Sequence, residues 1–189
     1  MGEIVMEAFL ASATVVVLAE LGDKTQLLAM AFAAKYAWQT VMAGVFAATV
    51  FNHFLAVAVG VYLGSFIDPK TMQLIASVAF IVFGLWTIRG DKLDGEDNAS
   101  RFSPFWTVVI AFFLAEMGDK TQFATITLAA HYQALLPVLA GTTTGMMLAD
   151  GLGIIVGMVL HKAIPERALK WIAAVIFIGC GAAGLYGAL

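Results

Sequence analysis

The sequence predicts an all-α membrane protein with six transmembrane helices, arranged as two inverted three-helix repeats. Three observations predict this fold class. The 189-residue chain is 61% apolar and 12% charged, with a mean hydropathy of +0.92, whereas soluble domains are about half apolar and about a quarter charged. Its apolar residues gather in six long segments. A short acidic motif occurs twice, about 96 residues apart.

Each apolar segment predicts one membrane crossing. At a rise of about 1.5 Å per residue, about 20 helical residues cross the hydrocarbon, and every segment is long enough or nearly so. The first and fourth are longer than needed, which predicts tilt, an interfacial extension or a break. A break near Gly22 and Gly118 fits, since irregular backbone is tolerated where it lines a cavity. The segments are 4–34, 40–66, 71–88, 104–130, 136–160 and 166–189.

The second half of the chain repeats the first, and residues 74–81 match residues 171–178 well outside the motif. Three crossings per half make the second half enter the membrane in the opposite orientation, so a pseudo-two-fold axis in the membrane plane relates the halves. The predicted domains are a first repeat at 1–88, a polar cytoplasmic linker at 89–103 and a second, inverted repeat at 104–189.

Lysines and arginines predict the orientation. With the N-terminus outside, seven of them lie in inner loops and only Lys70 lies in an outer loop, as the positive-inside rule requires. Both termini are therefore expected outside, in a bacterial inner membrane. Glu3 and Glu7 stand where a signal peptide would be basic, so the first helix is expected to be retained.

The repeated motif carries the predicted chemistry: residues 19–26 are AELGDKTQ and residues 115–122 are AEMGDKTQ. An ionised side chain at the bilayer centre costs about 2.5–3.5 kcal/mol on insertion scales, so such residues usually face a protein-lined ion or proton pathway. On a continuous helix, Glu20, Asp23 and Lys24 would share one face. The pseudo-two-fold axis would bring this face and its second copy together near the midplane.

Pairing of the two copies gathers four carboxylates, which cannot all stay charged and uncompensated in a low dielectric. They are expected to bind a cation, hold protons, or pair with Lys24 and Lys120. The first two options together amount to proton-coupled cation exchange. A purely structural alternative pairs the glutamate and lysine of each copy within one helix, but it leaves Asp23 and Asp119 unmatched.

The donor atoms predict the kind of cation. Carboxylate, hydroxyl and amide oxygens suit hard divalent ions such as calcium, magnesium or manganese. The single cysteine, Cys180, does not provide the cysteine-based site that soft metals prefer. Asn52 and Asp150 are candidate ligands for which interhelical hydrogen bonding is the alternative, and His53 is less favoured. The candidate metal-binding residues are Glu20, Asp23, Glu116, Asp119, Thr25, Thr121, Gln26, Gln122, Asn52 and Asp150. Glycines expected to allow close helix packing are Gly44, Gly60, Gly141, Gly145, Gly153 and Gly157.

The duplicated Glu-x-Gly-Asp-Lys-Thr signature, three helices per half and a polar central loop resemble the Gdt-type cation exchanger family, which includes bacterial MneA-type manganese exporters and Golgi and chloroplast relatives. The resemblance covers essentially the whole chain. It implies export of manganese or calcium against protons, with Glu20, Asp23, Glu116 and Asp119 in the acidic positions of the motif. The short chain is similar to the prokaryotic branch, for which manganese export is favoured.

Together these features predict a proton-coupled divalent cation antiporter that exports Mn²⁺, or Ca²⁺, and is not an enzyme. Its expected partners are the metal ion, protons and the lipid bilayer, with no cofactor; a homo-oligomer is compatible with the sequence. The alternative is a channel with the acidic cluster as its selectivity filter. An intramembrane metalloenzyme is disfavoured, because the sequence has no His-Glu-x-x-His motif. Nucleic-acid binding is not expected without a basic patch and interleaved aromatics.

Overall fold

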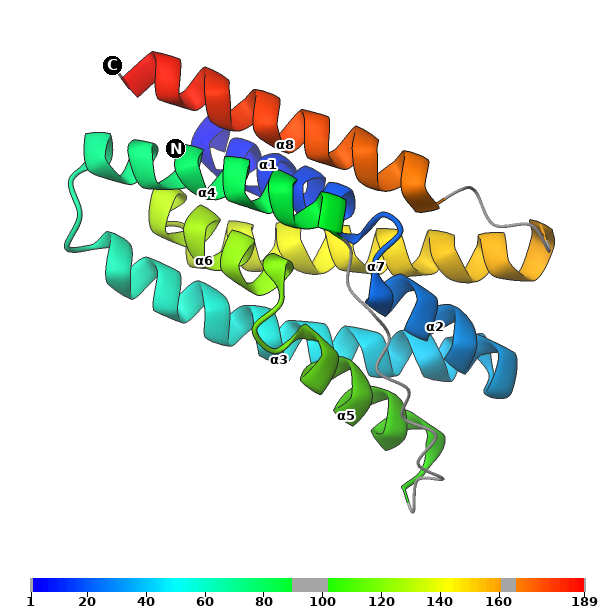
Figure 1. The fold of residues 1–189 in the computed structure, drawn as a ribbon. Helices are drawn as coiled ribbons and strands as arrows, with labels where there is room; N and C mark the ends of the chain where they lie inside the picture. The colour runs from blue at the N-terminus through cyan, green and yellow to red at the C-terminus, as the bar shows by residue number, and fades with distance from the viewer. Residues whose placement is uncertain (1, 90–101, 161–165, 189) are drawn as a thin grey trace.

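The computed structural model describes residues 2–89, 102–160 and 166–188. All regular secondary structure in these ranges is helical (Figure 1). Most of the linker predicted at 89–103 lies outside the described residues. The helices are α1 (Gly2–Glu20), α2 (Lys24–Lys35), α3 (Trp38–Gly64), α4 (Pro69–Arg89), α5 (Pro104–Glu116), α6 (Lys120–Tyr132), α7 (Leu135–Leu160) and α8 (Glu166–Ala188).

The first and fourth apolar segments are each divided into two helices. The breaks centre on Gly22 and Gly118, whose φ angles are 72° and 75°, a left-handed conformation that costs other residues about 1–2 kcal/mol. The predicted break is therefore confirmed. The expectation that Glu20, Asp23 and Lys24 share one helical face is wrong, because the chain turns at the glycine between the first of these residues and the other two.

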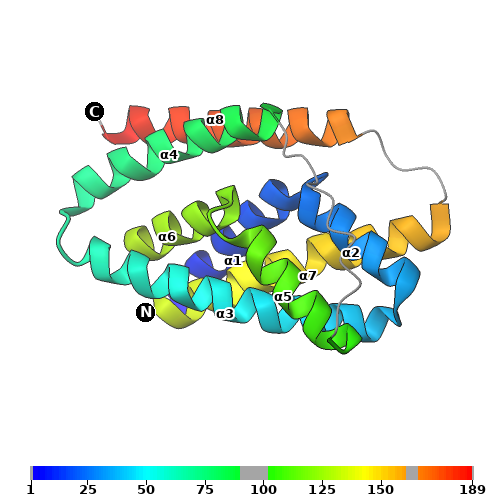
Figure 2. The same ribbon diagram turned by 60° about the horizontal axis from the view of Figure 1, so that its bottom comes forward.

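The helices run roughly along one axis (Figures 1 and 2). α1 and α2 follow this axis in one direction, α3 returns and α4 runs forward again, whereas α5 and α6 start from the opposite end. α4 and α8 lie side by side as a layer over the other helices. The start of α1 and the end of α8 lie at the same end of the molecule.

The largest helix contacts join the first half of the chain to the second. α7 packs against α1 and α2, and α3 packs against α5 and α6. Glycines permit this approach: a Cβ atom at Gly141 would lie 2.4 Å from the carbonyl oxygen of Phe9 in α1, and one at Gly60 would lie 2.3 Å from that of Ile126 in α6. Close packing is confirmed for Gly44, Gly60, Gly141, Gly145 and Gly153, whereas Gly157 is outside the residues whose packing is described.

The outside of the helix bundle is apolar. Three of the described helical stretches are long and apolar enough to cross a membrane, namely α1, α3 and residues Leu135–Ile155 of α7. Their large side chains face outward; Phe51 and Leu152, for example, are 57% and 50% exposed. Shorter apolar stretches lie in the other helices at Lys70–Leu85, Pro104–Glu116 and Ala174–Gly187. Polar side chains are buried between the helices instead, which is the arrangement expected in hydrocarbon.

A candidate metal site of buried carboxylates

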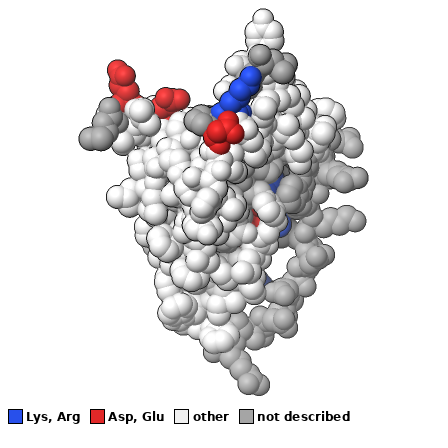
Figure 3. Space-filling model, turned by 90° about the vertical axis from the view of Figure 1, so that its left-hand side faces the viewer, with Lys and Arg blue, Asp and Glu red and all other residues white. Residues whose placement is uncertain are grey.

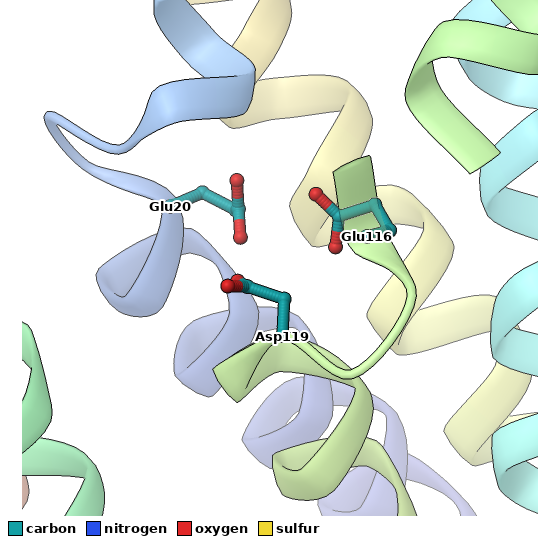
Figure 4. A group of neighbouring side chains, drawn as sticks. All are labelled: Glu20, Glu116 and Asp119. Atoms are coloured by element: carbon teal, nitrogen blue, oxygen red, sulfur yellow. The ribbon is translucent and has the colours of Figure 1, made fainter. Parts of the chain in front are cut away.

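The two helix breaks bring three carboxylates together, here called the carboxylate cluster: Glu20 at the end of α1, Glu116 at the end of α5 and Asp119 just before α6. Each offers one oxygen within 4.8 Å of the others, and Figure 4 shows the three side chains pointing toward one another. All three residues are at most 2% exposed. Buried acids at this spacing can share one cation.

Each carboxylate of the cluster has one oxygen engaged and one uncommitted. The motif threonine donates its hydroxyl proton to Oε2 of the glutamate five residues earlier, Thr25 to Glu20, and Thr121 to Glu116 at 2.6 Å. Oε1 of both glutamates and Oδ2 of Asp119 are buried without a hydrogen-bond partner among the described residues. Buried polar atoms rarely stay unpaired, so these three oxygens are candidates to bind a cation or to hold protons. The threonines were expected as ligands. In the structure each hydroxyl donates to the glutamate of its own motif copy, and a direct role in metal binding stays a prediction.

The lysines pair across the two motif copies. Nζ of Lys24 lies 3.0 Å from Oδ1 of Asp119, and Lys120 pairs with Asp23. The structural alternative pairs the glutamate and lysine of one copy, whereas these ion pairs join each lysine to the aspartate of the opposite copy. Pairing of the motif acids with Lys24 and Lys120 was one of the expected outcomes, and both aspartates form such a pair. The predicted role of Asp23 as a metal ligand stays a prediction. The sequence predicts that the acids can pair with Lys24 and Lys120, but it does not predict which lysine meets which acid.

Gln26 and Gln122 fasten the broken segments to neighbouring helices. Oε1 of each accepts the backbone N–H of the glycine at its own break, at 2.9 and 2.8 Å. Nε2 of Gln26 donates to the carbonyl oxygen of Ala149 in α7 at 2.8 Å, and that of Gln122 donates to Oδ1 of Asn52 in α3. Both glutamines and Asn52 therefore satisfy polar groups freed at the breaks, and their role as metal ligands stays a prediction.

Two more buried titratable side chains occupy matching positions of the repeat, His53 in α3 and Asp150 in α7. They are 1% and 0% exposed, and neither the ring nitrogens nor the carboxylate oxygens have a hydrogen-bond partner among the described residues. The charge of Asp150 interacts with those of Glu116 and Asp23. Asp150 thus belongs to the same electrostatic site as the carboxylate cluster, and its predicted role as a direct ligand stays a prediction.

Charged side chains are sparse on the end face of the molecule where α1 begins and α8 ends. Figure 3 views the molecule from the end where α1 begins and α8 ends, and most of this face is uncharged. Lysine, arginine, aspartate and glutamate atoms gather along its upper edge, and a few others lie recessed among uncharged atoms. The acidic side chains of both motif copies are buried, whereas this end face of the described residues is largely uncharged.

Comparison with known proteins agrees with this arrangement. A family model described as "Divalent cation/proton antiporter GDT1" matches residues 8–95 and 104–189. A protein of Vibrio cholerae named "Putative manganese exporter" is 40% identical over 178 residues, which cover 93% of this chain and 89% of that protein. GDT1-like protein sll0615 of Synechocystis sp. is 28% identical over 91% of this chain and 93% of its own length. GDT1-like protein 4 of Oryza sativa subsp. indica is 28% identical over 92% of this chain and 71% of its own length. No solved structure matches the chain.

The matched ranges include both copies of the motif and every residue of the carboxylate cluster. The family consists of transporters, which confirms the resemblance and the prediction that the chain is not an enzyme. Divalent cations and protons are the transported species of the family, and the apolar helices fit an integral membrane protein. On this evidence the chain belongs to the GDT1 family of divalent cation/proton antiporters.

Proposed function

We propose that this protein exports Mn²⁺ from the bacterial cytoplasm in exchange for protons, through two inverted three-helix repeats that cross the inner membrane six times with both termini outside. The observation that carries the proposal is the carboxylate cluster with its three uncommitted oxygens. An all-oxygen site suits both Mn²⁺ and Ca²⁺. The 40% identity to a protein named as a manganese exporter supports Mn²⁺ as the principal cargo.

Charge balance in the cluster couples the metal to protons. Glu20, Glu116 and Asp119 are buried where uncompensated negative charge is costly. A bound divalent ion compensates the ionised carboxylates, and protons compensate them after the ion has left. Metal and protons therefore occupy the same oxygens in alternation, and the transport of one drives the transport of the other.

The inverted repeats supply the alternation of access. α7 packs against α1 and α2, and α3 packs against α5 and α6. The broken segment of each half is therefore in contact with a long helix from the other half. Rocking of one half against the other would open the midplane site first to the cytoplasm and then to the outside. Protonation of the carboxylates from outside would release the metal there.

The decisive experiment is uptake of Mn²⁺ into everted membrane vesicles that carry an imposed proton gradient. We expect uptake to stop when the gradient is collapsed, and Ca²⁺ to compete more weakly than unlabelled Mn²⁺. Glu20→Gln should abolish uptake while the protein stays folded in the membrane. Glu3→Gln is the matched control, because Glu3 is exposed at the start of α1, away from the cluster. Uptake that persists without a proton gradient would contradict antiport and favour a channel.

A further inference from the structure

We infer that the ammonium group of Lys24 is an internal counter-ion of the metal site. It pairs with Asp119 when the site is empty and is displaced when the metal binds. This inference rests on the proposed function, because it assigns a positive charge that, in addition to the protons, neutralises the metal site between transport events. The partner of Lys24 carries the first step of the argument. Asp119 contributes one oxygen to the ion pair with Lys24, at 3.0 Å, and its other oxygen is uncommitted.

A metal ion in the cluster would therefore share a carboxylate with the ammonium group. Two cations on one buried carboxylate repel each other strongly, because the surrounding dielectric is low. Occupation of the cluster by a divalent ion thus weakens the hold of Asp119 on Lys24. The lysine and the cargo compete for the same charge.

The exposure of the two lysines differs in the direction that this competition requires. The side chain of Lys24 is 21% exposed, whereas that of Lys120 is 4% exposed and pairs with Asp23, which is outside the three-carboxylate cluster. A lysine with an open side can swing its ammonium group toward water on its long stem. A lysine enclosed on all sides loses its partner only at a high desolvation cost. The ion pair between Lys24 and Asp119 can therefore open, whereas the equivalent pair between Lys120 and Asp23 stays closed.

Competition between Lys24 and the metal helps the metal to dissociate from the carrier. Protons replace the metal in the proposed exchange, and an ammonium group that returns to the site adds a second replacement for the charge of the metal. Lys24 returns to Asp119 as the metal leaves and so lowers the net affinity of the site. Removal of the lysine should therefore tighten metal binding.

The test measures binding of Mn²⁺ alone to the purified full-length protein, from the electron paramagnetic resonance signal of the free ion at fixed pH and ionic strength. Lys24→Gln should bind about tenfold more tightly than the wild type, and Lys24→Arg should stay within about threefold of it. In an Asp119→Asn background, the gain from Lys24→Gln should disappear, because the competition needs Asp119. Lys120→Gln is the symmetry-matched control, and any gain that it produces should persist in that background.

If Lys24→Gln raised the Mn²⁺ affinity equally in the wild-type and Asp119→Asn backgrounds, the inference would be overturned. Such a result would reflect only the long-range repulsion between the lysine charge and the metal. Unchanged or weaker binding by Lys24→Gln would also overturn it. Loss of folding in both Lys24→Gln and Lys24→Met would show that the lysine is a structural strut and not displaceable. Failure of the proposed function has a separate signature: Glu20→Gln and Glu116→Gln would bind Mn²⁺ as well as the wild type does.

Discussion

The hydroxyl groups of Thr25 and Thr121 decide which carboxylate oxygens remain for the cargo. Each threonine lies in the first turn of the helix after a break and donates a proton back to the glutamate before the break. The hydrogen bond fixes one glutamate oxygen and leaves the other facing the cluster. Two side chains of modest polarity therefore orient two ligands, one from each half of the molecule.

Substitution of Thr121 by valine keeps the volume but removes the donor. A hydrogen bond to a charged group contributes about 1.5–3 kcal/mol, so we expect Mn²⁺ affinity to fall by roughly tenfold or more in Thr121→Val and to recover in Thr121→Ser. Thr127→Val is the control in the same helix, because Thr127 donates only to the backbone oxygen of Phe123 as far as the described contacts extend. Equal losses in both valine variants would indicate a general disturbance of α6.

The roles of these polar residues could be predicted only in part. The sequence places the acids, threonines and glutamines at one buried site, because ionisable residues inside apolar segments gather in this way. It does not predict that Lys24 reaches Asp119, nor that Gln26 reaches α7. Both contacts depend on the direction of the chain after Gly22 and on packing between residues more than ninety positions apart.

At the scale of the helices, the apolar segments predict the elements to within a few residues. The fifth segment, predicted at 136–160, is α7 at Leu135–Leu160, and the long first and fourth segments are divided at their glycines. Length and hydropathy succeed here because the bilayer imposes both. They do not predict which helices touch. The close approach of α3 to α6 rests on the missing side chains at Gly60 and Gly64, where a Cβ would lie 2.3 Å from the carbonyl oxygen of Ile126 and 2.4 Å from that of Ala130.

A methyl group at Gly60 should separate α3 from α6. Its Cβ would lie 2.3 Å from the backbone oxygen of Ile126, which cannot move aside as a side chain would. Overpacking of this kind costs about 1–3 kcal/mol, so we expect Gly60→Ala to lower the midpoint of thermal unfolding in detergent. Gly179→Ala in α8 is the control, since a Cβ there meets nothing within 4 Å. A midpoint that falls equally in both variants would contradict the packing argument.

At the scale of the whole molecule, the start of α1 and the end of α8 lie at one end, as an even number of crossings requires. The charge of the loops predicts that this end faces outward. A reporter that is active only in the cytoplasm should therefore be silent when it is fused to the C-terminus. Activity of that fusion would reverse the proposed orientation and with it the direction of transport.

The coupling of metal to protons is also a property of the whole carrier. If metal displaces protons from the cluster, protons must displace metal in turn, so the affinity for Mn²⁺ should weaken as the pH falls. Binding to the purified protein should release protons that a weakly buffered solution records. Affinity that does not change between acidic and alkaline pH, with no protons released, would exclude carboxylate-mediated exchange.

Each broken segment is completed by the other half of the chain. Gln26 holds its turn to Ala149, and Gln122 holds its turn to Asn52, so a half alone would leave these amide groups without partners in hydrocarbon, where each costs several kcal/mol. Each half therefore supplies the hydrogen-bond acceptor that anchors the helix break of the other half. In the inverted topology that we propose, the two halves depend on each other to complete their buried turns.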